Sequence, residues 1–113
     1  MCKSETSFSS YQDKASITRS KSNMRNFELS NYALGLVCEA GEAGDIIKKV
    51  VYHGHDLDEQ ELKKELGDVL WYLSNICNVL GYSLEDIAKM NIEKLKKRYP
   101  NGFNTKDSVN RLD

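Results

Sequence analysis

The stretch LVCEAGEAGDIIKK, residues 36–49, has the apolar spacing of a buried helix but carries Glu39 and Glu42 three positions apart. A second acidic pair, Glu65 and Asp68, follows in KELGDVLWYL after a spacer of 22 residues. Residues i and i+3 project from one face of a helix, so each pair presents two carboxylates together. Burying a carboxylate without a partner raises the free energy of the folded state. We therefore expect another part of the site to offset this negative charge.

Helical periodicity continues on both sides of the acidic pairs and predicts an all-α, four-helix subunit. Apolar residues recur every three to four positions, and Leu29, Ala33, Leu36, Ala40, Ile47 and Val51 form the stripe expected to be buried in the second helix. Gly54 and Gly81 are expected to end helices, and Asp58 and Ser83 to cap the next ones. The three glycines of the second helix, Gly35, Gly41 and Gly44, predict close approach by another backbone or a ligand. The expected helices cover residues 10–18, 29–52, 59–80 and 84–99.

The two acidic helices are joined by a short loop, so we expect them to pack antiparallel with the acidic pairs level. Four carboxylates would then form one cluster of oxygen ligands, which suits Mg²⁺ or Mn²⁺. One alternative is that both pairs lie on solvated helix faces. A di-iron site is the other, but it needs Glu-x-x-His on two helices, and His53 and His55 both lie in the turn.

The fourth expected helix carries Asn91, Lys94 and Arg98 on one face. Lysine offers phosphate a point charge and arginine a bidentate fork. The alternative is a solvated basic face at a helix C-terminus. Trp71 and Tyr72 follow the second acidic pair and are either base-stacking residues or core anchors.

Composition indicates one soluble domain. The 113 residues are 40% hydrophobic and 29% charged, with a net charge of −1. These values give no reason to expect nucleic-acid or membrane binding, and no segment has the length of a membrane span. We expect Cys2, Cys38 and Cys77 to be small core residues of a cytoplasmic protein. The predicted organisation is a polar N-terminal segment with a short helix (1–27), a helical catalytic core (28–100) and a polar C-terminal tail (101–113).

Three blocks together resemble the MazG family of all-α nucleoside triphosphate pyrophosphohydrolases: GLVCEAGEAGDIIKK, ELGDVLWYL and LEDIAKMNIEKLKKRYPNGF. The family pattern is Glu-x-x-Glu, a spacer, then Glu-x-x-Asp. The resemblance implies cleavage between the α- and β-phosphates of a nucleotide, giving a monophosphate and pyrophosphate. It also implies that the four acids hold Mg²⁺, and we favour Glu42 as the base that activates water. By the same resemblance, Asn91, Lys94 and Arg98 bind phosphates, and Phe27 and Tyr32 join Trp71 and Tyr72 as possible base contacts.

Without its polar ends the chain keeps few residues of strong helical pattern, and a core that small is marginal alone. We therefore expect a homodimer or tetramer, with antiparallel helices assembled into a bundle and the active site completed near the subunit interface. Two functional alternatives stay open. One is hydrolysis of another pyrophosphate, such as a modified nucleotide or an alarmone. The other is a non-catalytic helical oligomer that binds a nucleotide or a protein partner.

Overall fold

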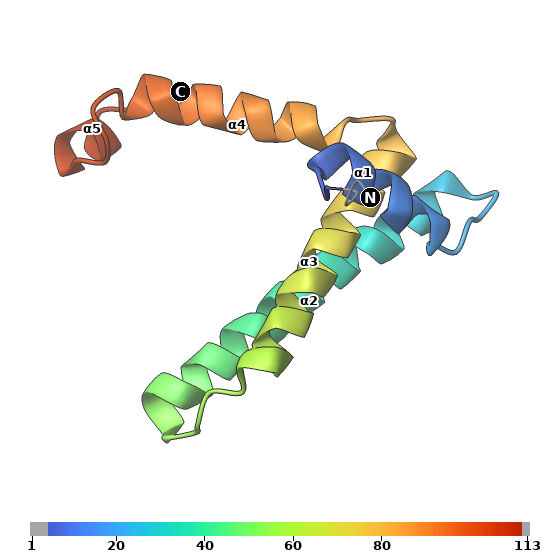
Figure 1. Ribbon diagram of the computed structural model, residues 1–113, viewed down its shortest axis with the longest axis horizontal. Helices are drawn as coiled ribbons and strands as arrows, with labels where there is room; N and C mark the ends of the chain where they lie inside the picture. The colour runs from blue at the N-terminus through green and yellow to red at the C-terminus, as the bar shows by residue number, and fades with distance from the viewer. Residues whose placement is uncertain (1–4, 112–113) are drawn as a thin grey trace.

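The computed structural model describes residues 5–111, and its regular elements are helices (Figure 1). This confirms the predicted all-α class, since the described chain has no strand beyond an isolated bridge between Pro100 and Gly102. None of the described helices is long and apolar enough to cross a membrane. In chain order the helices are α1 (Phe8–Ile17), α2 (Arg25–His53), α3 (Glu59–Leu80), α4 (Leu84–Arg98) and α5 (Thr105–Val109).

Helices α2 and α3 form the predicted antiparallel hairpin (Figure 1). Gly54 ends α2 with a φ of 72°, and its N–H donates to the carbonyl of Lys49. Glycine adopts this left-handed conformation without steric cost. Asp58 then caps α3, because its carboxylate accepts a 3.1 Å hydrogen bond from the Glu61 N–H. These two caps return the chain alongside α2 and bring the acidic pairs onto facing helices.

Helix α1 holds the turn between α3 and α4. The Gln12 amide donates a 2.7 Å hydrogen bond to the carbonyl of Tyr82 and accepts one of 2.8 Å from the Leu84 N–H. Asn75 of α3 is fully buried and donates to the carbonyl of Ala15 over 3.3 Å. Because these bonds tie α1 to both neighbours, they fix the direction in which α4 leaves α3.

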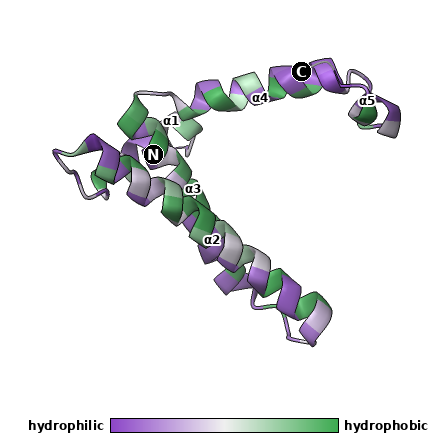
Figure 2. Cartoon of the chain, turned by 180° about the vertical axis from the view of Figure 1, so that it is seen from behind, coloured by the Kyte–Doolittle hydropathy of each residue, from purple (hydrophilic) through white to green (hydrophobic). Residues whose placement is uncertain are grey.

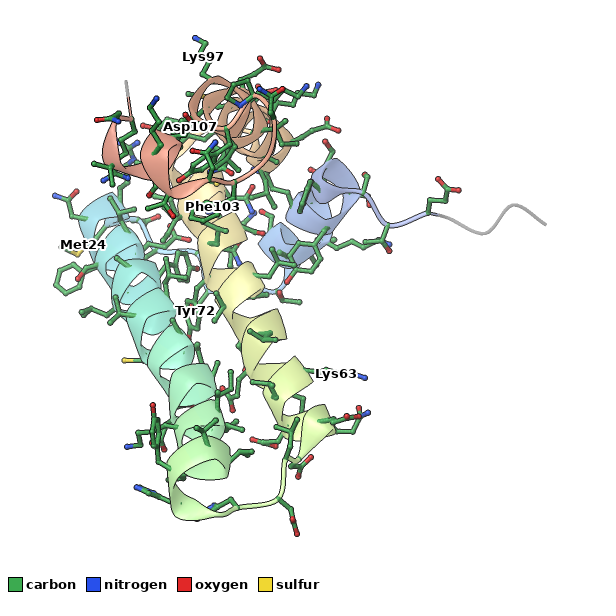
Figure 3. The ribbon with its side chains drawn as sticks, turned by 90° about the vertical axis from the view of Figure 1, so that its left-hand side faces the viewer. Met24, Lys63, Tyr72, Lys97, Phe103 and Asp107 are labelled. Carbon is green, nitrogen blue, oxygen red and sulfur yellow. The ribbon has the colours of Figure 1, made fainter. Side chains whose placement is uncertain are left out.

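We call residues 84–111, which contain α4 and α5, the arm. The arm leaves the upper end of the hairpin and diverges from it, so that α5 and the hairpin turn lie at the two tips of an open angle (Figure 1). After a quarter turn of the view, α4 is seen nearly end-on above the hairpin (Figure 3). The radius of gyration is 17.4 Å, against roughly 13 Å for a compact chain of this length. The single subunit is therefore open.

The core of this open subunit is small. Apolar and polar residues alternate along the hairpin and the arm (Figure 2), and many large apolar side chains stay uncovered. Leu34 and Val37 of α2 are 64% and 69% exposed, and Met90 of α4 is 71% exposed. The buried apolar residues of the described chain are Ala15, Tyr32, Ala43, Cys77 and Leu84.

Two burial predictions for α2 are wrong. Ala33, Ala40, Ile47 and Val51 of the expected stripe are exposed, whereas Tyr32 and Ala43 face inward. Cys38 is also exposed rather than in the core. The reason is that α2 packs mainly on α3, so a second apolar line of the helix has no neighbour among the described residues. Cys77 is buried as predicted, and Cys2 lies outside the described residues.

The C-terminal tail contains a helix that the sequence did not predict, so residues 5–111 form five helices rather than four. Asn104 caps α5 by accepting a 2.7 Å hydrogen bond from the Asp107 N–H. The helix has five residues, too few to show apolar periodicity, and its start is specified by the cap alone. The predicted oligomeric bundle and the domain boundaries stay predictions.

Candidate functional site

The hairpin brings three of the four predicted acids together. One carboxylate oxygen from each of Glu39, Glu42 and Glu65 lies within 4.8 Å of the other two. We call these three residues the acidic cluster. Two members come from α2 and one from α3, so the cluster exists only because the hairpin aligns the helices. Three converging oxygen donors have the chemistry of a site for a hard divalent cation.

Two of the carboxylates are poorly solvated. Glu39 and Glu65 are half-buried, and Oε2 of each is enclosed without a hydrogen-bond partner among the described residues. Glu42 is exposed. Enclosed carboxylate oxygens without donors are unfavourable when ionised, so the cluster needs either a proton or a cation.

Crowding by the neighbouring carboxylates shifts the pKa of Glu65. The nearby Glu39 carboxylate has the largest effect on the pKa of Glu65, and burial and the Glu42 carboxylate add to it. Together they raise this pKa to about 8 from its ordinary 4.5. Two carboxylates that share a site cannot both ionise freely. Without a cation, Glu65 therefore keeps its proton at neutral pH, whereas a bound cation would displace it.

We expect the metal-free protein to lose stability as the pH rises from 4.5 to about 8. In this window the unfolded chain has released the Glu65 proton while the folded chain still holds it. The folded state binds more protons, so the free energy of unfolding falls with pH and levels off once Glu65 ionises in both states. Urea denaturation in a chelator measures the slope, and Glu65→Gln is the control that lacks this contribution. Equal slopes for the two proteins would contradict the assignment.

Asp68 is not a member of the acidic cluster. Its side chain is exposed, and it lies near α1, where its negative charge adds to burial in raising the pKa of Tyr11. Three residues advance an α-helix by about 300°, so Asp68 is displaced by roughly 60° around α3 from Glu65. A role for Asp68 as a metal ligand stays a prediction.

The predicted base contacts form a packed aromatic group beside the hairpin interior. The Tyr32 ring is 2% exposed and lies edge-on to Trp71, with ring centres 5.5 Å apart. Trp71 also meets Tyr72 edge-on at 5.0 Å, and its Nε1 donates a 2.7 Å hydrogen bond to Thr18. Tyr72 lies between the two hairpin helices (Figure 3). Phe27 is separate and 67% exposed. Base binding by any of these rings stays a prediction.

Sequence reasoning missed the ion pair that supports this aromatic group. Arg19 lies 3.3 Å from Glu28, and both side chains are largely buried. Glu28 also accepts a 3.1 Å hydrogen bond from the Tyr32 hydroxyl. The available signal was the spacing of Glu28 and Tyr32, which at i and i+4 share one face of α2.

The predicted phosphate ligands lie on the arm, away from the acidic cluster. Asn91 and Lys94 are exposed on α4, and the Arg98 guanidinium lies over the Tyr99 ring, 5.9 Å from its centre. Figure 3 shows Lys97, a neighbour on α4, at the opposite end of the molecule from Lys63 of the hairpin. The structure therefore does not bring the cations and the acids of one subunit together.

The sequence matches the MazG nucleotide pyrophosphohydrolase domain over residues 27–103. Gene 37 protein of Mycobacterium phage L5 is 37% identical over 78 residues, which are 66% of this chain and 68% of that protein. Uncharacterized protein YvdC of Bacillus subtilis (strain 168) is 44% identical over 41 residues, 36% of this chain and 39% of that protein. No solved structure gives a significant match. The matched family region holds all four predicted acids and α4, whereas α1 and α5 lie outside it.

Proposed function

The chain belongs to the MazG nucleotide pyrophosphohydrolase family, and on that premise we propose that it hydrolyses nucleoside or deoxynucleoside triphosphates between the α- and β-phosphates. The products are a nucleoside monophosphate and pyrophosphate. The observation that carries the proposal is the convergence of Glu39, Glu42 and Glu65 within 4.8 Å. A set of oxygen donors on rigid helices supports phosphate chemistry better than nucleophilic or redox chemistry, which would need other side chains.

The acidic cluster fits Mg²⁺, with Mn²⁺ as a substitute. The enclosed oxygens of Glu39 and Glu65 have no hydrogen-bond donor among the described residues. A bound cation would supply the partner that these oxygens lack. Glu39, Glu42 and Glu65 would hold the ion, with Asp68 as a fourth ligand. A bound divalent ion supplies neutralisation of phosphate charge and a more acidic water.

Glu42 is our choice for the residue that takes the proton of the attacking water. It is the exposed member of the acidic cluster, so its carboxylate can meet both water and substrate. Asn91, Lys94 and Arg98 are assigned to the phosphates. For the base, Trp71 and Tyr72 are better placed than Tyr32, since both are partly exposed whereas Tyr32 is buried.

We also propose that the functional unit is a homodimer or a tetramer. The described subunit buries few large side chains, and Leu34, Val37 and Met90 are each more than 60% exposed. Large uncovered apolar surfaces mark interaction sites. A second copy would cover them and close the open shape.

The proposed reaction is tested by separating the products of a panel of common and modified triphosphates, with and without Mg²⁺. We expect monophosphate and pyrophosphate, formed only with the divalent ion. Orthophosphate with a nucleoside diphosphate would overturn cleavage between the α- and β-phosphates. Thermal stabilisation by a non-hydrolysable triphosphate, without turnover of any substrate, would instead identify a nucleotide-binding oligomer.

A further inference from the structure

The hairpin turn carries the two histidines of the chain, and the proposed reaction uses neither of them. His53 is the last residue of α2, and His55 follows Gly54. Both side chains are exposed, and their ring centres lie 6.4 Å apart. The turn is the free tip of the hairpin, away from α1 and the arm (Figure 1). Imidazole is the commonest metal ligand in proteins and suits Zn²⁺, Ni²⁺ and Cu²⁺.

The backbone of the turn holds the two histidines in a fixed relation. Gly54 lies between them with a φ of 72°, a left-handed conformation that glycine adopts without steric cost. The N–H groups of Gly54 and His55 both donate to the carbonyl of Lys49, and the bond from His55 measures 3.1 Å. Because the backbone is already ordered, bringing the two rings onto one ion costs only the entropy of their side chains.

A small movement of the two rings is enough for both to bind one ion. Imidazoles that share a tetrahedral ion, with each nitrogen about 2.0–2.1 Å from the metal, have ring centres about 5 Å apart. The observed separation is 6.4 Å, and rotation of the two exposed side chains can close the difference. Among residues 5–111, the ligand atoms of three or more His, Cys, Asp or Glu side chains converge only in the acidic cluster. Water would therefore complete the coordination of an ion at the turn.

The charges around the turn favour a cation. Residues 50–62 contain no Lys or Arg. They contain four acids: Asp56, Asp58, Glu59 and Glu61. The nearest lysines on α2, Lys48 and Lys49, pair with Asp45 at 3.1 Å and 2.9 Å, so their ammonium groups are held by the preceding turn of the helix. Surrounding negative charge raises the local concentration of cations.

The histidine pair and the acidic cluster are separate and select different metals. His53 lies about 16 Å along α2 from Glu42, at about 1.5 Å per residue, so one ion cannot contact both groups. Carboxylate oxygens suit Mg²⁺, whereas imidazole nitrogens suit the softer transition ions. Mg²⁺ in excess would therefore leave the histidines free to bind another metal.

We infer that His53 and His55 together bind one divalent transition ion of the Zn²⁺ or Ni²⁺ class, with water as the remaining ligands. The inference does not rest on the proposed function. In the unfolded chain no ordered turn holds the two rings together, so the ion binds the folded protein more tightly. Its binding therefore stabilises the fold.

Ni²⁺ is the probe, titrated by calorimetry into the full-length protein in excess Mg²⁺. The buffer is mildly alkaline, because imidazole binds a metal only in its neutral form. We expect one Ni²⁺ per chain, both in the wild type and in a variant that combines Glu39→Gln, Glu42→Gln and Glu65→Gln. His53→Asn and His55→Asn should each weaken binding by at least about tenfold, since the loss of even an outer partner of a metal ligand costs this much.

Thermal melting gives a second readout of the same site. At about ten times its dissociation constant, Ni²⁺ should raise the melting temperature of the wild type by about 5 °C. The same concentration should leave the melting temperature of both histidine variants nearly unchanged. A rise of equal size in either histidine variant would contradict binding by the pair.

Two further variants serve as controls. Asp56→Asn removes a charge beside His55 but no imidazole, and Cys38→Ser removes an exposed thiol that could also bind Ni²⁺. Both should bind Ni²⁺ much as the wild type does. The inference is overturned if the wild type in excess Mg²⁺ binds no Ni²⁺, or if either histidine variant keeps the wild-type affinity. Binding that disappears with the thiol or with the three glutamates would place the ion elsewhere and overturn it as well.

Discussion

Glu65→Gln is expected to abolish triphosphate hydrolysis and, in the absence of metal, to make the protein more stable. The activity should fall by two to three orders of magnitude, roughly the cost of losing one electrostatic contact at a reacting centre. Stability should rise because Glu65 is crowded by Glu39 and Glu42, which raise its pKa to about 8. Glutamine keeps the shape, is neutral without having to bind a proton and can donate to both neighbours.

The matched control is Glu61→Gln, the same chemical change one turn earlier on α3, where the side chain is exposed. It should leave hydrolysis unchanged and the melting temperature nearly so. Initial rates at saturating Mg²⁺ and thermal melting in a chelator measure the two effects. Full activity of Glu65→Gln would remove Glu65 from the site, and a lower melting temperature would show that the three carboxylates do not repel one another.

Opposite signs for activity and stability would separate a functional cluster from a structural one. A structural carboxylate network stabilises the fold, so neutralising a member should cost stability. A site built to hold a cation stores repulsion between like charges until the ion binds. The enclosed oxygens of Glu39 and Glu65, which have no donor among the described residues, agree with the second case.

The sequence predicted the hairpin because its signals are local. Gly54 and Asp58 specify where α2 ends and α3 begins, and the positions of the acidic pairs relative to this turn place them level. Glu39, Glu42 and Glu65 consequently converge as expected. Asp68 does not converge with these three residues, and its place as a fourth ligand stays a prediction.

The direction of the arm could not be predicted in the same way. It depends on the Gln12 side chain reaching Tyr82 and Leu84, some 70 positions later in the chain. No periodicity in the sequence encodes such a long-range polar contact. Because of the same limit, the sequence does not show that α4 carries Asn91, Lys94 and Arg98 away from the hairpin of their own subunit (Figure 1).

Gly35→Ala is expected to destabilise the hairpin, whereas the same change at Gly44 should stabilise it. Three glycines of α2 were predicted to mark close approach by another backbone or a ligand. Among them, within the described residues, Gly35 alone has a close neighbour, and that neighbour is the side chain of Tyr72. A Cβ on Gly35 would overlap the Tyr72 ring, and nothing lies within 4 Å of one on Gly44. Replacing glycine by alanine in an open helix contributes about 1 kcal/mol, whereas overpacking costs about 1–3 kcal/mol.

Tyr72 has little freedom to give way, because it packs against Trp71 at 5.0 Å and lies 6.3 Å from Tyr32. We therefore expect Gly35→Ala to lower the free energy of unfolding by up to about 2 kcal/mol, the overpacking cost less the helix gain. Urea denaturation followed by helical circular dichroism measures this change.

In a Tyr72→Ala background, Gly35→Ala should become stabilising, because the ring that the new methyl group would strike is gone. If Gly35→Ala stabilises the wild type as much as Gly44→Ala does, the ring does not rest on Gly35. The packing of the aromatic group against α2, one helical turn before Glu39, would then have to be revised.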